Sequence, residues 1–140
     1  SNSEFVGQYN FDEHLEILSD KNKLHLSVFD KSGNALVGYI ILFGLDDPND
    51  SLEFRRIAIS QKGLGFGKDA VQIIKEICFS QLKKHRLHLS VFSDNFTAIN
   101  LYESLGFKKD GLIRDCIKWN DNYRSMWIMS MLDSEYSSKK

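Results

Sequence analysis

The sequence predicts an α/β domain in which helices pack on a mixed, mostly antiparallel sheet. Segments with the period-2 alternation of strands outnumber segments with helical spacing. The segments follow the order helix, three strands, helix, strand, helix, two strands, and short loops join the early strands, which makes them antiparallel. A helix joins the third strand to the fourth and therefore implies one parallel pair with a right-handed crossover. A chain of 140 residues fits one core, so we expect a single domain over 1–140.

The first half supplies one helix and three strands. Residues 11–18 predict a short amphipathic helix with Leu15 and Leu18 on one face. The sequence KLHLSVFD at 23–30 alternates as a strand does, KSGN forms a hairpin turn, and two further strands follow at 35–45 and 51–60. The one proline, Pro48, marks a loop between these last two strands.

The second half supplies two helices and three strands. Apolar residues at helical spacing predict a helix over 68–82, and 86–92 alternates as a strand. A second helix over 95–106 has Asn95 as its N-cap and Gly106 as its C-terminal stop. A closing hairpin joins strands 111–119 and 123–132 through the turn Asn-Asp-Asn.

Composition narrows the class of protein. The formal net charge of -1 gives no general attraction to nucleic acid or to an anionic membrane, and no apolar run approaches the length of a membrane span. With no signal peptide at the start, we expect a cytoplasmic protein. Cys78 and Cys116 are far apart in sequence and lie in apolar-periodic stretches, so both are expected to be buried free thiols. The four histidines show no metal-ligand spacing, and no metal site is predicted.

Three glycines at alternate positions follow the third strand, in the stretch SQKGLGFGKDA at 60–70. A dinucleotide fingerprint would need glycine at Lys68, and a phosphate-binding P-loop would need glycine at Lys62 and Ser or Thr at Asp69. What remains is a strand that ends, a glycine turn and a helix start, whose backbone N–H groups favour an anion such as phosphate. Lys62 and Lys68 would add positive charge. The alternative is a tight strand-to-helix turn with no ligand.

A second pattern, NFTAINLYESLGF, begins at Asn95 and places Ala98 and Tyr102 on one helix face. Alone, this pattern is more typical of core packing than of chemistry. Together with KGLGFG about thirty residues earlier, it resembles the GCN5-related N-acetyltransferase (GNAT) superfamily, and the similarity extends from Leu52 to Leu132. The closing stretch GLIRDCIKWNDNYRSMWIMSML is similar to the subgroup of ribosomal-protein N-terminal and polyamine acetyltransferases.

The resemblance implies a cosubstrate, acetyl-CoA, and a GNAT-like sheet with a central parallel strand pair. The pyrophosphate of acetyl-CoA would bind backbone amides of the glycine loop. The pantetheine arm of acetyl-CoA would run along the third strand as an added strand does. Asn95 would contact the CoA arm beside Ala98. The loop and strand positions that the resemblance assigns to cosubstrate binding are Ile57, Ala58, Ile59, Lys62, Gly63, Leu64, Gly65, Phe66, Gly67 and Lys68.

The resemblance also implies a chemistry. Tyr102 would protonate the leaving thiolate, and a backbone N–H near Ile57 would stabilise the attacked thioester oxygen. Glu53 stands where one branch of the superfamily carries its general base. The alternative for Glu53 is an ion pair with Arg55, and pairing with carboxylates is also what we expect for Arg55 and Arg56.

Two departures from the family pattern stand out. Lys62 replaces the usual Arg or Gln of the first signature, which should weaken the phosphate site only modestly because backbone amides bind the phosphate. The chain also has little room for the strand and helix with which family members usually begin. Because those elements help to form the acceptor site, we expect acceptor binding to be affected if they are missing.

The resulting hypothesis is an acetyl-CoA-dependent N-acetyltransferase acting on a primary amine, either a protein N-terminus or a small polyamine-like molecule. One alternative is a CoA-binding regulatory or interaction domain without turnover, and another is an acyltransferase with a longer acyl donor. Trp119 and Trp127 in the closing hairpin are expected either to support a homodimer or to pack in the core.

Overall fold

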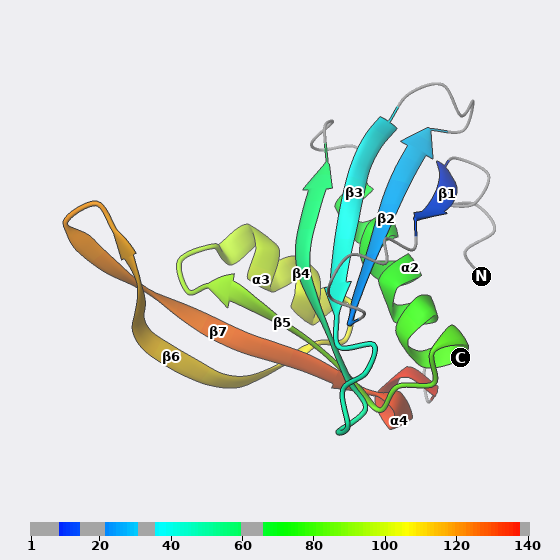
Figure 1. The fold of residues 1–140 in the computed structure, drawn as a ribbon. Helices are drawn as coiled ribbons and strands as arrows, with labels where there is room; N and C mark the ends of the chain where they lie inside the picture. Colours follow the sequence, from blue (N-terminus) through cyan, green and yellow to red (C-terminus); the bar gives the residue numbers. More distant parts are fainter. Residues whose placement is uncertain (1–8, 15–21, 31–35, 60–65, 138–140) are drawn as a thin grey trace.

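A computed structural model describes residues 9–14, 22–30, 36–59 and 66–137 and shows one seven-stranded sheet (Figure 1). The strand order is β1-β2-β3-β4-β5-β7-β6, and β4 with β5 is its parallel pair. The mixed, mostly antiparallel sheet predicted from the sequence is confirmed. The strands are β1 (Tyr9–His14), β2 (Lys23–Asp30), β3 (Leu36–Phe43), β4 (Ser51–Ile59), β5 (Arg86–Phe92), β6 (Lys108–Trp119) and β7 (Asn122–Leu132).

The helices are α2 (Phe66–Glu76), η1 (Ile77–Gln81), α3 (Phe96–Ser104) and α4 (Asp133–Ser137). The long helix predicted over 68–82 is observed, but its last turn, η1, is a π-helix. Asn95 caps α3 as predicted, because its side chain accepts a hydrogen bond from the backbone N–H of Ala98. Gly106 follows α3 with a φ of +101°, as expected of a glycine that ends a helix. The short helix α4 was not predicted.

The helix predicted over 11–18 is wrong in its first part. Residues 11–14 belong to β1, which pairs antiparallel with β2 from Tyr9↔Asp30 to His14↔His25. The apolar–polar alternation of this stretch is limited to Tyr9–Asp12, and the edge of β2 offers a ladder of backbone groups that pairs with it. Residues 15–18 and the predicted KSGN turn lie outside the described residues.

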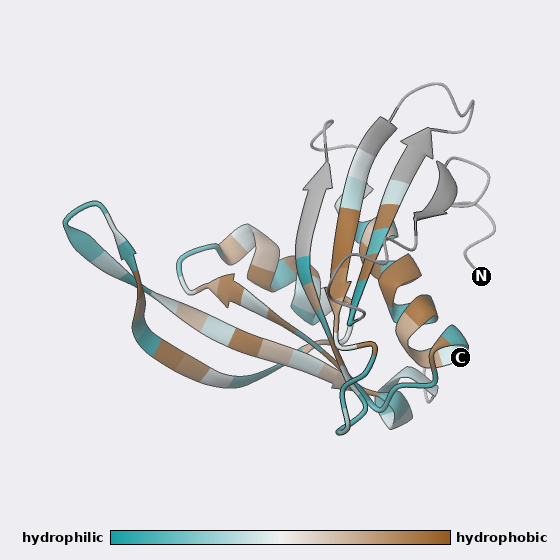
Figure 2. Cartoon of the chain, viewed as in Figure 1, coloured by the Kyte–Doolittle hydropathy of each residue, from teal (hydrophilic) through white to brown (hydrophobic). Residues whose placement is uncertain are grey.

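One face of the sheet carries the core. The buried strand residues recur at every second position, so they point to the same face, where α2 and α3 lie side by side. The two helices are joined by a buried hydrogen bond of 2.8 Å from Lys75 Nζ to the carbonyl of Leu105. Figure 2 shows hydrophobic stretches along β3 and α2. The buried strand residues are Leu24, Leu26, Ile40, Leu42, Leu52, Phe54, Leu87, Leu89, Val91, Met129 and Met131.

The two cysteines differ, which corrects one prediction. Cys78 is buried, and this burial raises the pKa of its thiol to about 12, so the thiol stays protonated. Cys116 is exposed because it lies on β6, outside the region covered by helices. Both are free thiols, as predicted.

The described helices include none that is both long and apolar enough to cross a bilayer. The described His, Cys, Asp and Glu residues likewise form no group of three that could hold a metal ion.

Gly44, between β3 and β4, tolerates no side chain. Its φ is +112°, and a Cβ built there would lie 2.5 Å from the carbonyl oxygen of Ser51. We therefore expect Gly44→Ala to lower the free energy of unfolding by about 2–3 kcal/mol, measured by urea denaturation. The matched control is Gly111→Ala, where a Cβ meets nothing within 4 Å and the expected change is below about 1 kcal/mol. Equal stability of the two variants would contradict the steric argument.

Candidate active site

The central parallel pair is short, and the sheet opens beyond it. The strands β4 and β5 pair only from Ser51↔Arg86 to Glu53↔His88. From there, β4 continues along β3 to Ile59, while β5 continues along β7 to Phe92. The register of β3 against β4 shifts between Ile41 and Leu42, which leaves Arg55 as the extra residue of a β-bulge. A bulge bends its strand, so this one turns β4 away from β5.

A pocket of about 430 Å³ occupies the opening. Its walls come from β4, β5, α3 with the residue before it, and the middle of β7. The lining residues are Phe54, Arg55, Leu89, Ser90, Val91, Phe92, Asn95, Ala98, Tyr102 and Met126.

Tyr102 lies on the wall that α3 contributes. Its ring packs edge-on against Phe54 at 5.7 Å and Phe107 at 5.9 Å between ring centroids. Burial raises the pKa of the Tyr102 phenol above its ordinary value of 10. The hydroxyl is therefore neutral at physiological pH and can act as a proton donor.

Asn95 and Ala98 lie on the same wall, at the start of α3. The side-chain oxygen of Asn95 accepts from the Ala98 backbone N–H at 3.2 Å, which fixes the carboxamide at the pocket rim. The cap therefore holds both residues of the sequence motif in the pocket lining together with Tyr102.

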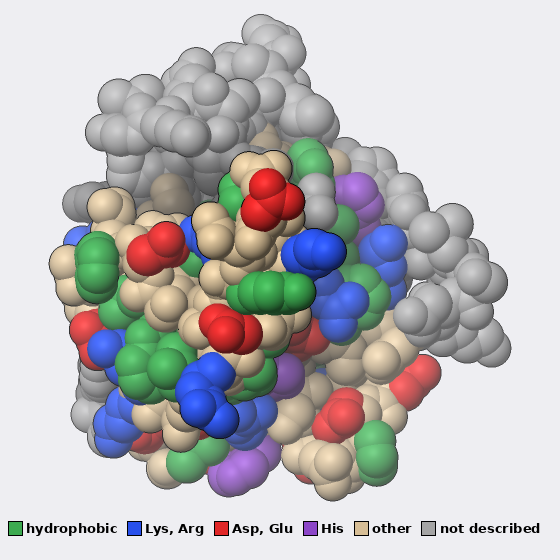
Figure 3. Space-filling view, turned by 90° about the vertical axis from the view of Figure 1, so that its left-hand side faces the viewer, with side chains coloured by type: hydrophobic (Ala, Val, Ile, Leu, Met, Phe, Trp, Pro, Cys, Tyr) green, Lys and Arg blue, Asp and Glu red, His purple; other side chains and the backbone are tan. Residues whose placement is uncertain are grey.

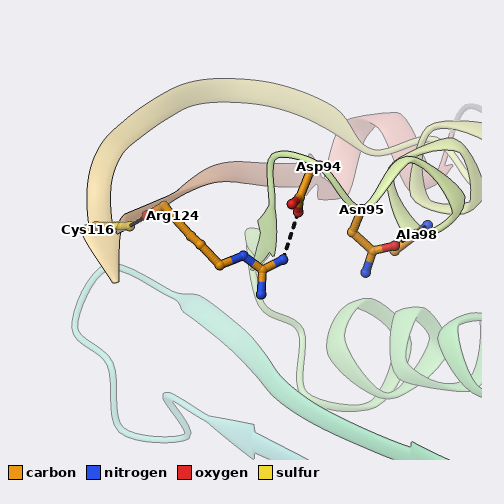
Figure 4. A network of polar contacts seen from close by, with 5 residues as sticks. All are labelled: Asp94, Asn95, Ala98, Cys116 and Arg124. Carbon is orange, nitrogen blue, oxygen red and sulfur yellow. Dashed lines mark hydrogen bonds and ion pairs between the residues drawn. The ribbon is translucent and has the colours of Figure 1, made fainter. Parts of the chain in front are cut away.

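Arg124, on β7, forms an ion pair with Asp94 in the turn that precedes α3. Figure 4 shows Arg124 reaching from β7 to Asp94, and the N–O distance is 2.7 Å. This contact lowers the pKa of the Asp94 carboxyl, chiefly through the hydrogen bond from Arg124. The guanidinium also lies 3.5 Å from the centroid of the Phe92 ring, another part of the pocket wall. Sequence reasoning missed Arg124 because thirty residues separate it from Asp94, with no local pattern to connect them.

A comparison with protein-family models identifies the family. Residues 1–107 match the model described as the Acetyltransferase (GNAT) family. The chain belongs to the GNAT acetyltransferase family. It is thus an enzyme that uses acetyl-CoA to acetylate an amine nitrogen.

Curated proteins and solved structures are similar to this GNAT acetyltransferase. It is 25% identical over 125 residues to the probable N-acetyltransferase YjcK of Bacillus subtilis, covering 88% of this chain and 69% of that protein. It is 28% identical over 134 residues to the spermidine N(1)-acetyltransferase of Vibrio cholerae, covering 92% of this chain and 77% of that protein.

Two solved structures from Vibrio cholerae are also similar. A spermidine N-acetyltransferase in complex with CoA and spermine is 28% identical, with a TM-score of 0.78 over 84% of this chain and 70% of that one. A spermidine/spermine N-acetyltransferase is 22% identical and shares the fold, with a TM-score of 0.85 over 99% and 98% of the two chains.

In the GNAT acetyltransferase, Glu53 lies at the point where β4 and β5 part. Its carboxylate accepts from Arg55 at 2.9 Å, so the ion pair considered in the sequence analysis is present. Arg55 also stacks on the Phe43 ring at 4.1 Å and lines the pocket, whereas Glu53 is not among the lining residues. Arg55 therefore lines the pocket. Glu53 does not line it but contacts Arg55 through the ion pair.

His88 is the parallel partner of Glu53 and was not singled out from the sequence. Partial burial, followed by the nearby Arg86 charge, lowers the pKa of its imidazole below 6.5. The ring is therefore neutral at physiological pH. It stands on the sheet face opposite the helices, next to the Glu53–Arg55 pair.

Only part of the loop predicted to bind the cosubstrate belongs to the described residues. Lys62, Gly63, Leu64 and Gly65 lie outside the described residues. The helix α2 begins at Phe66, with Gly67 and the exposed Lys68 in its first turn. The backbone of Ile57, Ala58 and Ile59 continues β4 beyond the split, paired on its other edge with β3.

Proposed function

We propose that the enzyme moves the acetyl group of acetyl-CoA directly to a primary amine, with Tyr102 as the general acid. The neutral amine attacks the thioester carbonyl and forms the new C–N bond, and the C–S bond then breaks. Tyr102 donates its phenolic proton to the departing thiolate, while the attacking nitrogen gives up a proton to a base. The observation that carries this proposal is the neutral Tyr102 phenol in the wall of the pocket where β4 and β5 part.

The glycine loop is the proposed binding site for the pyrophosphate. The positive end of the α2 dipole and the backbone N–H groups of its first turn favour an anion there. Gly63, Gly65 and Gly67 would allow the phosphates to approach the backbone without a Cβ between them. Lys62 and Lys68 would add charge.

The strand end at Ile57–Ile59 is the proposed site for the pantetheine arm. The pairing of β4 with β5 stops at Glu53, so the edge of β4 that faces the split has no strand beside it among the described residues. An extended amide chain fits such an edge as an added strand would. The backbone N–H near Ile57 would then stabilise the thioester oxygen.

A polyamine is the acceptor favoured by the relatives, two of which are named for acetyl transfer to spermidine. A protein N-terminus is the second acceptor class. We would measure CoA release from acetyl-CoA with spermidine, spermine and a short peptide bearing a free N-terminus, and locate the acetyl group by mass spectrometry. Acetylated spermidine would support the proposal, and a peptide-only reaction would move the assignment to N-terminal acetylation.

The same assay separates the enzyme from a CoA-binding domain without turnover. CoA release that depends on added amine requires catalysis, whereas calorimetric binding of acetyl-CoA would fit both. Parallel runs with longer acyl-CoA donors would test the remaining alternative, a different acyl specificity.

Glu53 is the proposed base, acting directly or through water. We expect Glu53→Gln to lower kcat/KM by about 100-fold, because the amide cannot take the proton. The matched control is Arg55→Met, which removes the ion pair but keeps the carboxylate, and should leave kcat within about threefold. If Glu53 serves only the ion pair, both variants would change the free energy of unfolding by at most about 1 kcal/mol and leave kcat intact.

A further inference from the structure

Two lysines, Lys75 and Lys84, are buried among the described residues. Lysine side chains usually lie at the surface, and Figure 3 shows Lys and Arg side chains spread over the end of the molecule that carries the β6–β7 hairpin. A lysine is rarely enclosed unless its amine has a partner. Lys75 is 6% exposed, and its Nζ donates to the carbonyl of Leu105 at 2.8 Å. This hydrogen bond links the last turn of α2 to the end of α3.

The Leu105 carbonyl belongs to the C-cap of α3. The last carbonyls of a helix have no intrahelical donor, and the helix dipole gives this end a partial negative charge. An amine is therefore a suitable partner for the carbonyl. Because the amine comes from a different helix, the bond fixes the position of α3 relative to α2.

The helix α3 has little buried surface of its own. Of its nine residues only Ile99 is buried, and Ala98, Leu101 and Tyr102 are partly buried against the core. Segments with few buried apolar contacts shift and open more easily than the core does. One buried polar contact can therefore contribute a large part of what fixes the place of α3.

Tyr102 lies close to the anchored end of α3. Its backbone carbonyl accepts from the N–H groups of Leu105 and Phe107, at 3.1 and 3.0 Å. The contact made by Lys75 thus continues through Leu105 to the backbone of Tyr102. Since the Tyr102 side chain lines the pocket, a displacement of this turn would move the hydroxyl within the pocket.

The other end of α2 belongs to the proposed pyrophosphate site. Gly67 lies in the first turn of α2, and a Cβ built there would lie 3.8 Å from Leu101 of α3. Lys75 follows about 12 Å further along the helix axis. One helix would therefore hold both the phosphates of acetyl-CoA and the segment that carries the proposed acid.

We propose that Lys75 is a positioning residue for acetyl transfer: its hydrogen bond to Leu105 sets the distance between the Tyr102 hydroxyl and the thioester sulfur. This inference rests on the proposed role of Tyr102 as the general acid. Lys75 is not among the residues that line the pocket, so it acts through the position of α3. A misplacement of about 1 Å caused far from the reacting atoms can lower a rate about 100-fold.

A double-mutant cycle between Lys75 and Tyr102 tests the proposal. We would measure kcat as CoA release, with whichever of spermidine, spermine and the peptide is acetylated. Lys75→Met keeps the apolar stem but removes the donor, and it should lower kcat about tenfold with the KM for acetyl-CoA within about twofold. Added to Tyr102→Phe, it should lower kcat by less than about twofold, because the hydroxyl that it positions is already absent.

Lys84 provides the matched control. It is 8% exposed, and its Nζ donates to the carbonyl of Leu45, in the loop after β3, at 2.9 Å. Lys75→Met and Lys84→Met each leave a carbonyl without its donor, so both should lower the unfolding temperature to a similar extent. Lys84→Met should nevertheless leave kcat within about twofold. Lys75→Gln, whose amide is one bond shorter than the lysine side chain, is the second variant and should lose as much kcat as Lys75→Met.

The outcomes separate this inference from the proposed function. A kcat at the wild-type level in the folded Lys75 variants would overturn the positioning role, as would an equal loss in Lys84→Met. A loss of the same size with and without the Tyr102 hydroxyl would assign Lys75 a purely structural role. If Tyr102→Phe itself keeps the wild-type kcat, the general acid is wrong and the positioning role is wrong with it.

Discussion

Replacement of Tyr102 by phenylalanine is expected to lower kcat by about 10²–10³-fold while the Kd for acetyl-CoA changes less than twofold. The ring still packs against Phe54 and Phe107, so the pocket wall keeps its shape. Only the hydroxyl that would protonate the thiolate is lost. Steady-state kinetics gives kcat, and calorimetric titration gives the Kd.

The pH dependence of the wild-type rate provides a second test of the general-acid role of Tyr102. Because burial raises the pKa of Tyr102 above 10, the acid should remain protonated and the wild-type rate should not decline on its account below about pH 10. A matched control is Phe107→Leu, which disturbs the packing around Tyr102 but keeps its hydroxyl. If Tyr102→Phe turns over at the wild-type rate, or if Phe107→Leu loses as much kcat, the general-acid assignment is wrong.

Replacement of Gly65 by valine is expected to weaken acetyl-CoA binding at least 100-fold, because a branched side chain would stand between the loop amides and the phosphates. This prediction rests on the sequence motif, since Gly65 lies outside the described residues. The fold should survive, as the loop precedes α2. Calorimetric titration with acetyl-CoA measures the loss, and circular dichroism checks the fold.

The control is Gly111→Val, the same substitution on β6, where a Cβ meets nothing within 4 Å. It should bind acetyl-CoA as the wild type does. Retained affinity in Gly65→Val would exclude a backbone cradle at this glycine and move the phosphate site elsewhere.

The local signals for the cap and the end of α3 proved reliable. Asn95 caps α3 and Gly106 ends it because both roles depend on backbone groups within a few residues. The β6–β7 hairpin and the parallel crossover followed from the order of elements. The family motifs then pointed to Asn95, Ala98 and Tyr102, which the structure brings together in one pocket wall.

Features that depend on distant partners were beyond such reasoning. Residues 11–14 form a strand because β2 offers an edge, which a helical pattern in the segment itself cannot reveal. The bulge at Arg55 and the ion pair of Arg124 with Asp94 depend on register and tertiary contact. Cys116 is exposed because β6 projects from the body, although its neighbours alternate as buried residues would.

The short pairing of β4 with β5 has a consequence for the degradation of the enzyme in a cell. Across the sheet, three residue pairs join the half that holds β1–β4 to the half that holds β5–β7. A cosubstrate lying in the split would bridge the halves and stabilise the folded state by about 2.7 kcal/mol when present at a hundred times its Kd. Without bound acetyl-CoA, the two halves of the sheet would separate more often at the short β4–β5 pairing. Proteolytic degradation should therefore be faster when acetyl-CoA is scarce. The abundance of the protein would then follow the metabolic supply of its own substrate.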